Sequence, residues 1–225
     1  MSFMRNRFLL TALAISLIIF FISSFYSVYR TDTLFDMLII QWVSQTISPA
    51  GIVVMETITF LGSGEVILVL TFLVAAVLFL KKHIYMALLL FFTTVGGMAL
   101  NLALKFAFQR ERPGEMSYIE VFGYSIELAS YSFPSGHTMR SVILFAFLIY
   151  ISWLFISSPV IKTFAYAGSI IMIILVGASR IIVGAHFPTD VIAAVSVSFV
   201  WVCFSVFIFP KLLSLSNYTK RLADK

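Results

Sequence analysis

Ionisable side chains interrupt two long apolar runs near the C-terminal end of this chain. Residues 179–190 read SRIIVGAHFPTD and carry Arg180, His186 and Asp190. A charge inside hydrocarbon costs about 3 kcal/mol or more, so side chains of this kind that are kept near a membrane usually have a function. These residue types suit proton transfer, nucleophilic attack and the binding of an anion.

His186 and Asp190 lie four residues apart, and Pro188 between them favours the first turn of a helix. In such a turn the two side chains share one face, so the carboxylate can bind one imidazole nitrogen. That contact fixes the tautomer and leaves the other nitrogen free to attack. The spacing therefore predicts His186 as a nucleophile that Asp190 orients.

A second histidine ends the turn FPSGH at residues 133–137, which precedes another apolar run. The N-terminus of a helix offers free backbone N–H groups and a positive dipole end, and both favour phosphate. Ser135 adds a hydroxyl donor, and Gly136 allows close approach of the backbone. His137 is placed to protonate a leaving oxygen.

Three cations complete the set of candidate site residues. Arginine forks suit phosphate oxygens, and a lysine adds a point charge. The predicted reaction is a two-step phosphoryl transfer through a phosphohistidine, with cations in place of magnesium. Two isolated histidines and scattered carboxylates do not make a metal site, so we expect no metal and no cofactor. The cations are Lys105, Arg112 and Arg180.

The composition is that of an integral membrane protein. Of 225 residues, 61% are hydrophobic and 11% are charged, and the mean hydropathy is +1.05. The net charge of +5 does not come from a soluble basic stripe, so nucleic acid is not an expected partner. A single cysteine, Cys203, excludes an intramolecular disulfide. No linker divides the chain, and one domain over residues 1–225 is expected.

Runs of about 20 apolar residues predict six membrane-spanning helices. The segment 31–60 mixes polar and apolar residues, which favours helices lying at the membrane interface. The expected fold class is therefore all-α, a six-transmembrane-helix bundle with interfacial helices in the first outer loop. The expected spans are approximately residues 8–28, 64–80, 84–106, 138–156, 161–182 and 188–209.

The distribution of charge predicts the topology. With both termini in the cytoplasm, nine of the fifteen Lys and Arg residues fall on the cytoplasmic side, and only Asp224 of the ten acids does. The polar ends of the last four spans then meet in one layer. The predicted site therefore faces the extracytoplasmic side of the cell membrane.

The polar stretches resemble the three signature motifs of the type-2 phosphatidic acid phosphatase superfamily. Residues 105–113 read K-x6-RP, residues 134–137 read PSGH, and residues 179–190 read SR-x5-H-x3-D, in the family's order. The resemblance implies a metal-independent lipid phosphatase, similar to small bacterial members that act on phosphatidylglycerophosphate or undecaprenyl diphosphate. It implies His186 as nucleophile, Asp190 as its orienting group and His137 as acid, with the phosphate held by Lys105, Arg112, Ser135, Gly136 and Arg180.

The leading expectation is hydrolysis of phosphatidylglycerophosphate to phosphatidylglycerol, with a bilayer lipid phosphate as partner and no obligate protein partner. Undecaprenyl diphosphate is the alternative substrate. From other classes, a proton or anion transporter and a non-catalytic lipid-binding scaffold remain. Arg140, one turn after His137, either approaches the site or binds a lipid headgroup. Arg110 and Glu111 are expected to be solvated loop residues.

Overall fold

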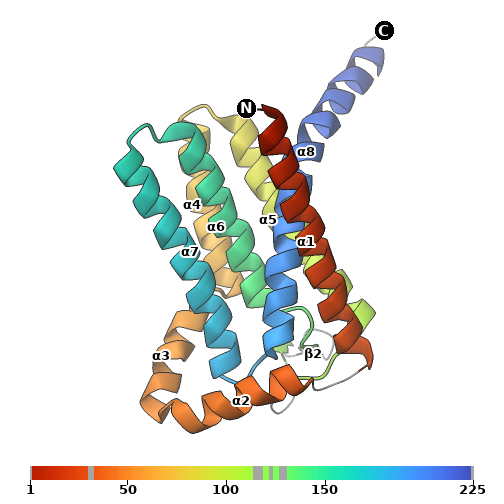
Figure 1. Ribbon diagram of the computed structural model, residues 1–225. Coiled ribbons are helices and arrows are strands. Elements are labelled where there is room, and N and C mark those ends of the chain that lie inside the picture. Colours follow the sequence, from red (N-terminus) through yellow and green to blue (C-terminus); the bar gives the residue numbers. More distant parts are fainter. Residues whose placement is uncertain (1, 30–32, 114–118, 122–123, 127–130, 224–225) are drawn as a thin grey trace.

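The protein folds into a helical bundle with one short hairpin (Figure 1). The computed structural model describes residues 2–29, 33–113, 119–121, 124–126 and 131–223. The strands β1 (Ile119–Val121) and β2 (Tyr124–Ile126) pair antiparallel, which the sequence did not predict. The helices are α1 (Ser2–Tyr29), α2 (Leu34–Thr46), α3 (Pro49–Phe60), α4 (Gly64–Leu80), α5 (Ile84–Phe108), α6 (Gly136–Phe155), α7 (Pro159–Ile182) and α8 (Pro188–Ala223).

The expected membrane spans correspond to helices of the structure. Within the described residues, α1, α5, α6, α7 and α8 are long and apolar enough to cross a bilayer, whereas α4 has 17 residues and is shorter. The segment between α1 and α4 folds into α2 and α3, which meet at a bend of 119°. The prediction of an all-α transmembrane bundle is confirmed.

Capping residues explain where several of these helices begin. The hydroxyl of Thr33 accepts from the backbone N–H of Asp36 at 3.0 Å, which caps α2. Ser48 and Ser158 cap α3 and α7, and a proline follows each of them in the first turn. A polar cap therefore marks the start of a helix even where apolar sequence surrounds it.

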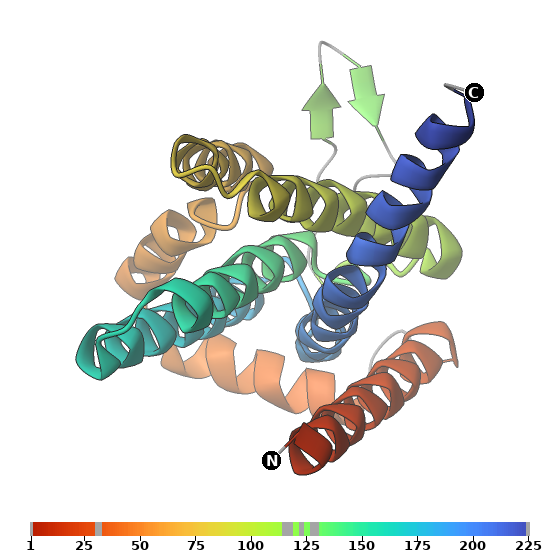
Figure 2. The same cartoon turned by 90° about the horizontal axis from the view of Figure 1, so that it is seen from above.

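The helix α6 lies at the centre of the bundle. It packs against α4, α5, α7 and α8, while α1 packs chiefly against α8 (Figure 2). Phe147 of α6 belongs to a core cluster shared with α4 and α5, and Met139 belongs to a second cluster shared with α8. Because the PSGH turn leads into α6, the packing of α6 also fixes the position of that turn.

Small residues bring α5 close to α8 and α6. A Cβ atom at Gly96 would lie 2.5 Å from Cζ2 of Trp201, and one at Gly97 would lie 2.2 Å from Cδ1 of Ile143. The indole N–H of Trp201 donates to the carbonyl of Thr93 at 2.8 Å. The two glycines thus serve close helix packing, and this contact holds the helix that carries Lys105.

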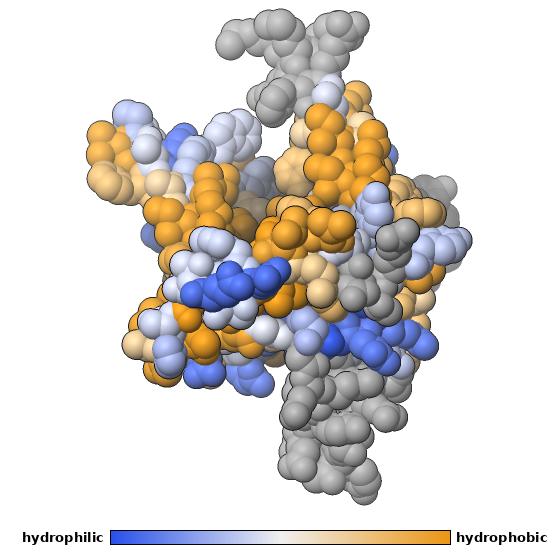
Figure 3. All heavy atoms as spheres, turned by 60° about the horizontal axis from the view of Figure 1, so that its bottom comes forward, coloured by the Kyte–Doolittle hydropathy of each residue, from blue (hydrophilic) through white to orange (hydrophobic). Residues whose placement is uncertain are grey.

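The two ends of the bundle differ. The first turns of α1 and the last turns of α8 lie at one end, and α2 and α3 lie across the other (Figure 1). Apolar residues cover much of the visible face in Figure 3, and hydrophilic residues form separate patches on it. The helix α8 continues past the expected end at residue 209 and contains Pro210, whose ring removes a backbone hydrogen bond. Its last turns lean away from the bundle (Figure 1).

Candidate active site

A cavity of about 570 Å³ collects residues from all three polar stretches near the end that carries α2 and α3. Part of its wall is apolar and comes from α4 and α5, through Leu68, Val95, Met98 and Leu102. The rest is mostly polar, and it includes Asn101, Lys105, Arg112, Gly136, His137, Arg140 and His186. A charged headgroup and an apolar chain could therefore occupy the same cavity.

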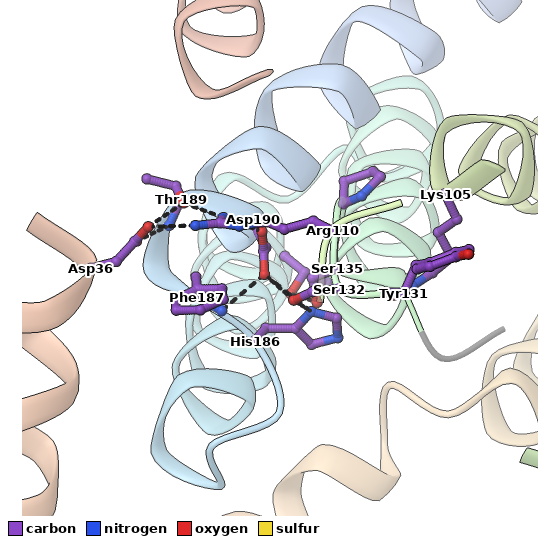
Figure 4. A network of polar contacts seen from close by, with 12 residues as sticks. Asp36, Lys105, Arg110, Tyr131, Ser132, Ser135, His186, Phe187, Thr189 and Asp190 are labelled. Carbon is purple, nitrogen blue, oxygen red and sulfur yellow. Dashed lines mark hydrogen bonds and ion pairs between the residues drawn. The ribbon is translucent and has the colours of Figure 1, made fainter. Parts of the chain in front are cut away.

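The hydroxyl of Ser132 bridges His186 and Asp190. The Nδ1 atom of His186 lies 3.6 Å from Oδ2 of Asp190, which is too long for a good hydrogen bond, and 3.3 Å from Oγ of Ser132. A carboxylate can only accept, so Ser132 donates to Asp190 and its oxygen is left to accept from Nδ1–H. Figure 4 shows these three side chains converging. This arrangement places the proton of His186 on Nδ1 and leaves Nε2 with a free lone pair.

Burial keeps His186 uncharged. Its side chain is 2% exposed, and loss of hydration lowers the pKa of its imidazole to about 3, although the hydrogen bonding and charge of Asp190 act in the opposite direction. A neutral imidazole with a free Nε2 is the form that can attack phosphorus. The geometry and the protonation state therefore agree with the role predicted from the sequence.

Arg140 contacts His137 and so takes part in the cavity. Its Nη2 atom lies 3.3 Å from Nδ1 of His137, and its Nε donates to the carbonyl of Gly62 at 3.4 Å. A guanidinium can only donate, so Nδ1 of His137 is the acceptor and its proton resides on Nε2. Of the two positions left open for Arg140 by the sequence, the structure favours the approach to the site.

The three predicted cations differ in how they relate to the cavity. Lys105 and Arg112 border the cavity, and Lys105 also donates to the carbonyl of Tyr131. Burial lowers the pKa of Arg112, although the negative charge of Asp190 acts in the opposite direction. Arg180 lies behind the lining, where its Nη1 donates to the hydroxyl of Thr59 in α3 at 2.7 Å. Its buried Nε has no hydrogen-bond partner among the described residues, which leaves a donor available for an anion.

The PSGH turn is packed tightly. Asn101 of α5 donates to the carbonyl of Pro134 at 3.1 Å, and a Cβ atom at Gly136 would lie 3.0 Å from the Oδ1 of Asn101 and 3.2 Å from Nη1 of Arg140. A larger residue at position 136 would therefore displace Asn101 or Arg140 by a few tenths of an ångström. Ser135 is fully buried, and its hydroxyl pairs with that of Thr138 at 2.9 Å.

The expectation that Arg110 is a solvated loop residue is wrong. Its side chain is buried, and it donates to Asp190 Oδ1 at 2.6 Å and to Asp36 Oδ2 at 2.9 Å. Its sequence neighbour Glu111 is exposed, as expected. The available signal was Asp36 itself, the one charged residue of α2, because a buried carboxylate needs a cationic partner. Ser132 was also missed, because a serine before a proline-containing turn carries no signature of its own.

The structure thus brings the eight predicted residues to one place in two layers. Five border the cavity, and the other three are buried next to it; their catalytic and binding roles stay predictions. Among the described residues, no three His, Cys, Asp or Glu side chains come together as a metal site would require. The bordering residues are Lys105, Arg112, Gly136, His137 and His186, and the buried ones are Ser135, Arg180 and Asp190.

Comparisons with known proteins agree with this arrangement. Phosphatidylglycerophosphatase B of Bacillus subtilis (strain 168) is 32% identical over 146 residues, which are 64% of this chain and 68% of that protein. The crystal structure of a transmembrane PAP2 type phosphatidylglycerolphosphate phosphatase from Bacillus subtilis superposes with a TM-score of 0.71, at 24% identity, over 88% of this chain and 96% of that one. The Aquifex aeolicus LpxE structure gives 0.56 at 22% identity, over 79% and 98%.

These two structures support the fold, and the sequence relative supports the family. The profile of the PAP2 superfamily matches residues 86–213, a stretch that contains every candidate site residue and covers more than half of the chain. The chain belongs to the PAP2 superfamily and is a multi-pass membrane protein of this phosphatase family.

Proposed function

We propose that the protein hydrolyses the phosphate monoester of a membrane lipid through a phosphohistidine at His186, and that the lipid is phosphatidylglycerophosphate. One observation carries the proposal: two histidines in complementary tautomers border one cavity together with cations. His186 presents a bare Nε2, and His137 carries its proton on Nε2. One imidazole is ready to attack and the other is ready to donate.

Binding of the phosphate is assigned to the cations and the PSGH turn. Lys105 and Arg112 border the cavity, and Arg180 lies behind it with a buried donor available. The N-terminus of α6 adds backbone N–H groups at Gly136 and a positive dipole end. Fixed donors of this kind stabilise the charge that develops on the transferring group.

In the first step, Nε2 of His186 forms a bond to phosphorus while the bond from phosphorus to the lipid oxygen breaks. The leaving oxygen takes the Nε2 proton of His137, so that the lipid departs as a neutral alcohol and His137 is left as an imidazolate, whose negative charge Arg140 offsets at Nδ1. The imidazole of His186 becomes positively charged as it acquires the phosphoryl group. The negative charge of Asp190 stabilises this positive charge through the hydroxyl of Ser132.

In the second step, a water molecule replaces the lipid alcohol. His137, now lacking its Nε2 proton, takes one from the water as the oxygen bonds to phosphorus. The bond from phosphorus to His186 breaks, inorganic phosphate leaves, and both histidines return to their starting tautomers. No proton or electron is left over at the end of the cycle.

The apolar part of the cavity wall supports a lipid substrate. Leu68 of α4 and Val95, Met98 and Leu102 of α5 extend from the polar residues along the membrane-spanning part of these helices. An acyl chain between α4 and α5 would remain in hydrocarbon while its phosphate reached His186. We propose this route for entry of the substrate from the bilayer.

The proposed orientation places both termini in the cytoplasm and the cavity on the extracytoplasmic side. Nine of fifteen basic residues but only one of ten acids then lie inside. The shared position of both ends of the chain, opposite α2 and α3, supports it (Figure 1). We propose that residues 1–225 act as one domain, without an obligate protein partner.

Phosphate release by the purified protein in detergent with EDTA tests the proposal. We would compare phosphatidylglycerophosphate, undecaprenyl diphosphate and phosphatidic acid, since the name of the 32% identical relative favours the first. His186→Ala should abolish release, and His83→Ala, which changes the exposed third histidine in the turn between α4 and α5, should not. No release of phosphate from any of the three lipids by folded protein would refute a phosphatase and favour a transporter or scaffold.

A further inference from the structure

A buried arginine at a variable position of the first family motif holds the carboxylate behind the proposed nucleophile. Arg110 is 3% exposed and lies in the segment that follows α5. Its Nη1 donates to Asp190 Oδ1 at 2.6 Å and to the hydroxyl of Thr189 at 2.7 Å. The guanidinium carbon also lies 4.0 Å from the centre of the Phe187 ring. Contacts with Phe187, Thr189 and Asp190 therefore tie Arg110 to the start of α8 and to the residue just before it.

The two oxygens of Asp190 have separate partners. Oδ1 accepts from Arg110, whereas Oδ2 accepts from the backbone N–H of Phe187 at 2.9 Å and from Ser132, which in turn faces His186. Because Arg110 binds Oδ1, the carboxylate cannot rotate without breaking a buried ion pair. Oδ2 is thereby kept toward the imidazole (Figure 4).

Asp36 from α2 completes the arrangement. Its side chain is fully buried, and its Oδ2 accepts from Arg110 Nη2 at 2.9 Å. Asp36 also accepts from the backbone N–H of Thr189 at 2.9 Å and from its hydroxyl at 2.8 Å. One carboxylate therefore holds both the arginine and the first turn of the helix that carries Asp190.

We propose that Asp36 and Arg110 are positioning residues for the proposed reaction, a buried pair through which α2 fixes Asp190 against His186. Neither residue borders the cavity that would hold the lipid. Both act through Asp190, so their loss should lower kcat and leave KM nearly unchanged. This inference rests on the proposed phosphatase activity and goes beyond it, because it assigns a catalytic requirement to the first outer loop.

Charge gives a second, independent signature. Arg110 offsets the negative charge of Asp190, and that charge favours protonation of His186. Without Arg110 the nucleophile should therefore protonate more readily, and the acidic limb of the kcat profile should move to higher pH. Without Asp36 the acidic limb should not move to higher pH, because Arg110 still offsets the charge of Asp190. The other charged or titratable groups that act on His186 and Asp190 are unchanged in these variants. They are Lys105 from α5, Arg112 after α5, His137 from α6 and Arg180 from α7.

The test measures kcat, KM and the pH profile of phosphate release from phosphatidylglycerophosphate by the full chain in detergent. Arg110→Gln should lower kcat about 100-fold, as expected when a reacting group is misplaced by about 1 Å. Arg110→Lys should recover part of the loss, and Asp36→Asn should lower kcat without an upward shift of the acidic limb. Glu111→Gln, at the exposed neighbouring position, is the matched control and should equal the wild type.

A folded Arg110→Gln variant with kcat within threefold of the wild type would overturn the inference, as would a loss confined to KM. If Arg110→Gln does not fold, Thr189→Val removes one hydroxyl of the network and must lower kcat while KM holds; an unchanged kcat would equally overturn it. If the wild type releases phosphate and Arg110→Gln has the same kcat, only the positioning role is refuted. No release by the wild type refutes the proposed function and this inference together.

Discussion

Replacing Asp190 by asparagine measures how much of the rate depends on the carboxylate behind His186. Oδ1 of Asp190 accepts from Arg110 at 2.6 Å, and Oδ2 accepts from Phe187 N at 2.9 Å and from the hydroxyl of Ser132. All of these partners are donors, whereas an amide keeps only one acceptor oxygen. In either orientation the new side chain turns an N–H group toward a buried donor.

The magnitudes decide which orientation is adopted. An amide nitrogen in place of Oδ1 would face the guanidinium of Arg110, and loss of a buried charged partner costs about 3–5 kcal/mol. An amide nitrogen in place of Oδ2 would face the neutral N–H of Phe187, at a cost of about 1–3 kcal/mol. The second orientation is therefore favoured. Ser132 must then donate to His186 Nδ1, which moves the imidazole proton to Nε2 and removes the nucleophilic lone pair.

A catalytic histidine held in the wrong tautomer loses about 10⁴ in kcat in the serine-protease case, or about 5.4 kcal/mol of transition-state stabilisation. We expect Asp190→Asn to lower kcat about 10³- to 10⁴-fold. The KM for the lipid should change less than threefold, because Asp190 does not border the cavity.

Single-turnover phosphate release in detergent provides the measurement, with His83→Asn as a control for the substitution chemistry. A thermal unfolding profile shows whether the variant is folded. We expect it to fold, because Arg110 retains Asp36 as a partner. A rate above one tenth of the wild type would refute the assigned tautomer of His186. It would also refute the proposal that Asp190 stabilises the positive charge of His186 through Ser132.

Three further outcomes are expected. Arg140→Leu removes the donor to Nδ1 of His137 and should lower kcat at least about 10-fold, with partial recovery in Arg140→Lys; equal rates would contradict the contact. Because burial lowers the pKa of His186 to about 3, this proposed nucleophile stays neutral from pH 6.5 down to about pH 3. The pH profile of wild-type kcat should therefore lack an acidic limb near 6.5. Gly97→Ala, whose Cβ would lie 2.2 Å from Cδ1 of Ile143, should cost about 1–3 kcal/mol of unfolding free energy, and Ile143→Val should restore part of the lost Tm.

Local sequence was sufficient for most of the fold. Long apolar runs predicted the spans, since a bilayer requires about 20 apolar residues of helix, and the six ranges agree with α1 and α4–α8. The end of α8 was missed because Pro210 bends the helix without stopping it. The hairpin of β1 and β2 was missed because three-residue strands leave no periodic pattern long enough to recognise.

The candidate site was predicted as a set of residue types but not as a network. Spacing placed His186 and Asp190 on one helix turn, yet their nitrogen and oxygen atoms are 3.6 Å apart and Ser132 joins them. Arg110 resembled a loop residue because its partner Asp36 lies 74 positions earlier. Pairing across such a distance depends on how the helices pack, and no local pattern encodes it.

The carboxylate of Asp190 also has a consequence for biogenesis. Besides the nearby N–H of Phe187, its direct partners come from residues 110 and 132, and Thr189 beside it is anchored to Asp36, a separation of 153 positions along the chain. Both His186 and Asp190 follow Asp36, Arg110 and Ser132 along the chain. A nascent chain that ends before α8 therefore has His186 and the predicted phosphate-binding cations but lacks Asp190, so the proposed orientation of His186 forms only once α8 has docked.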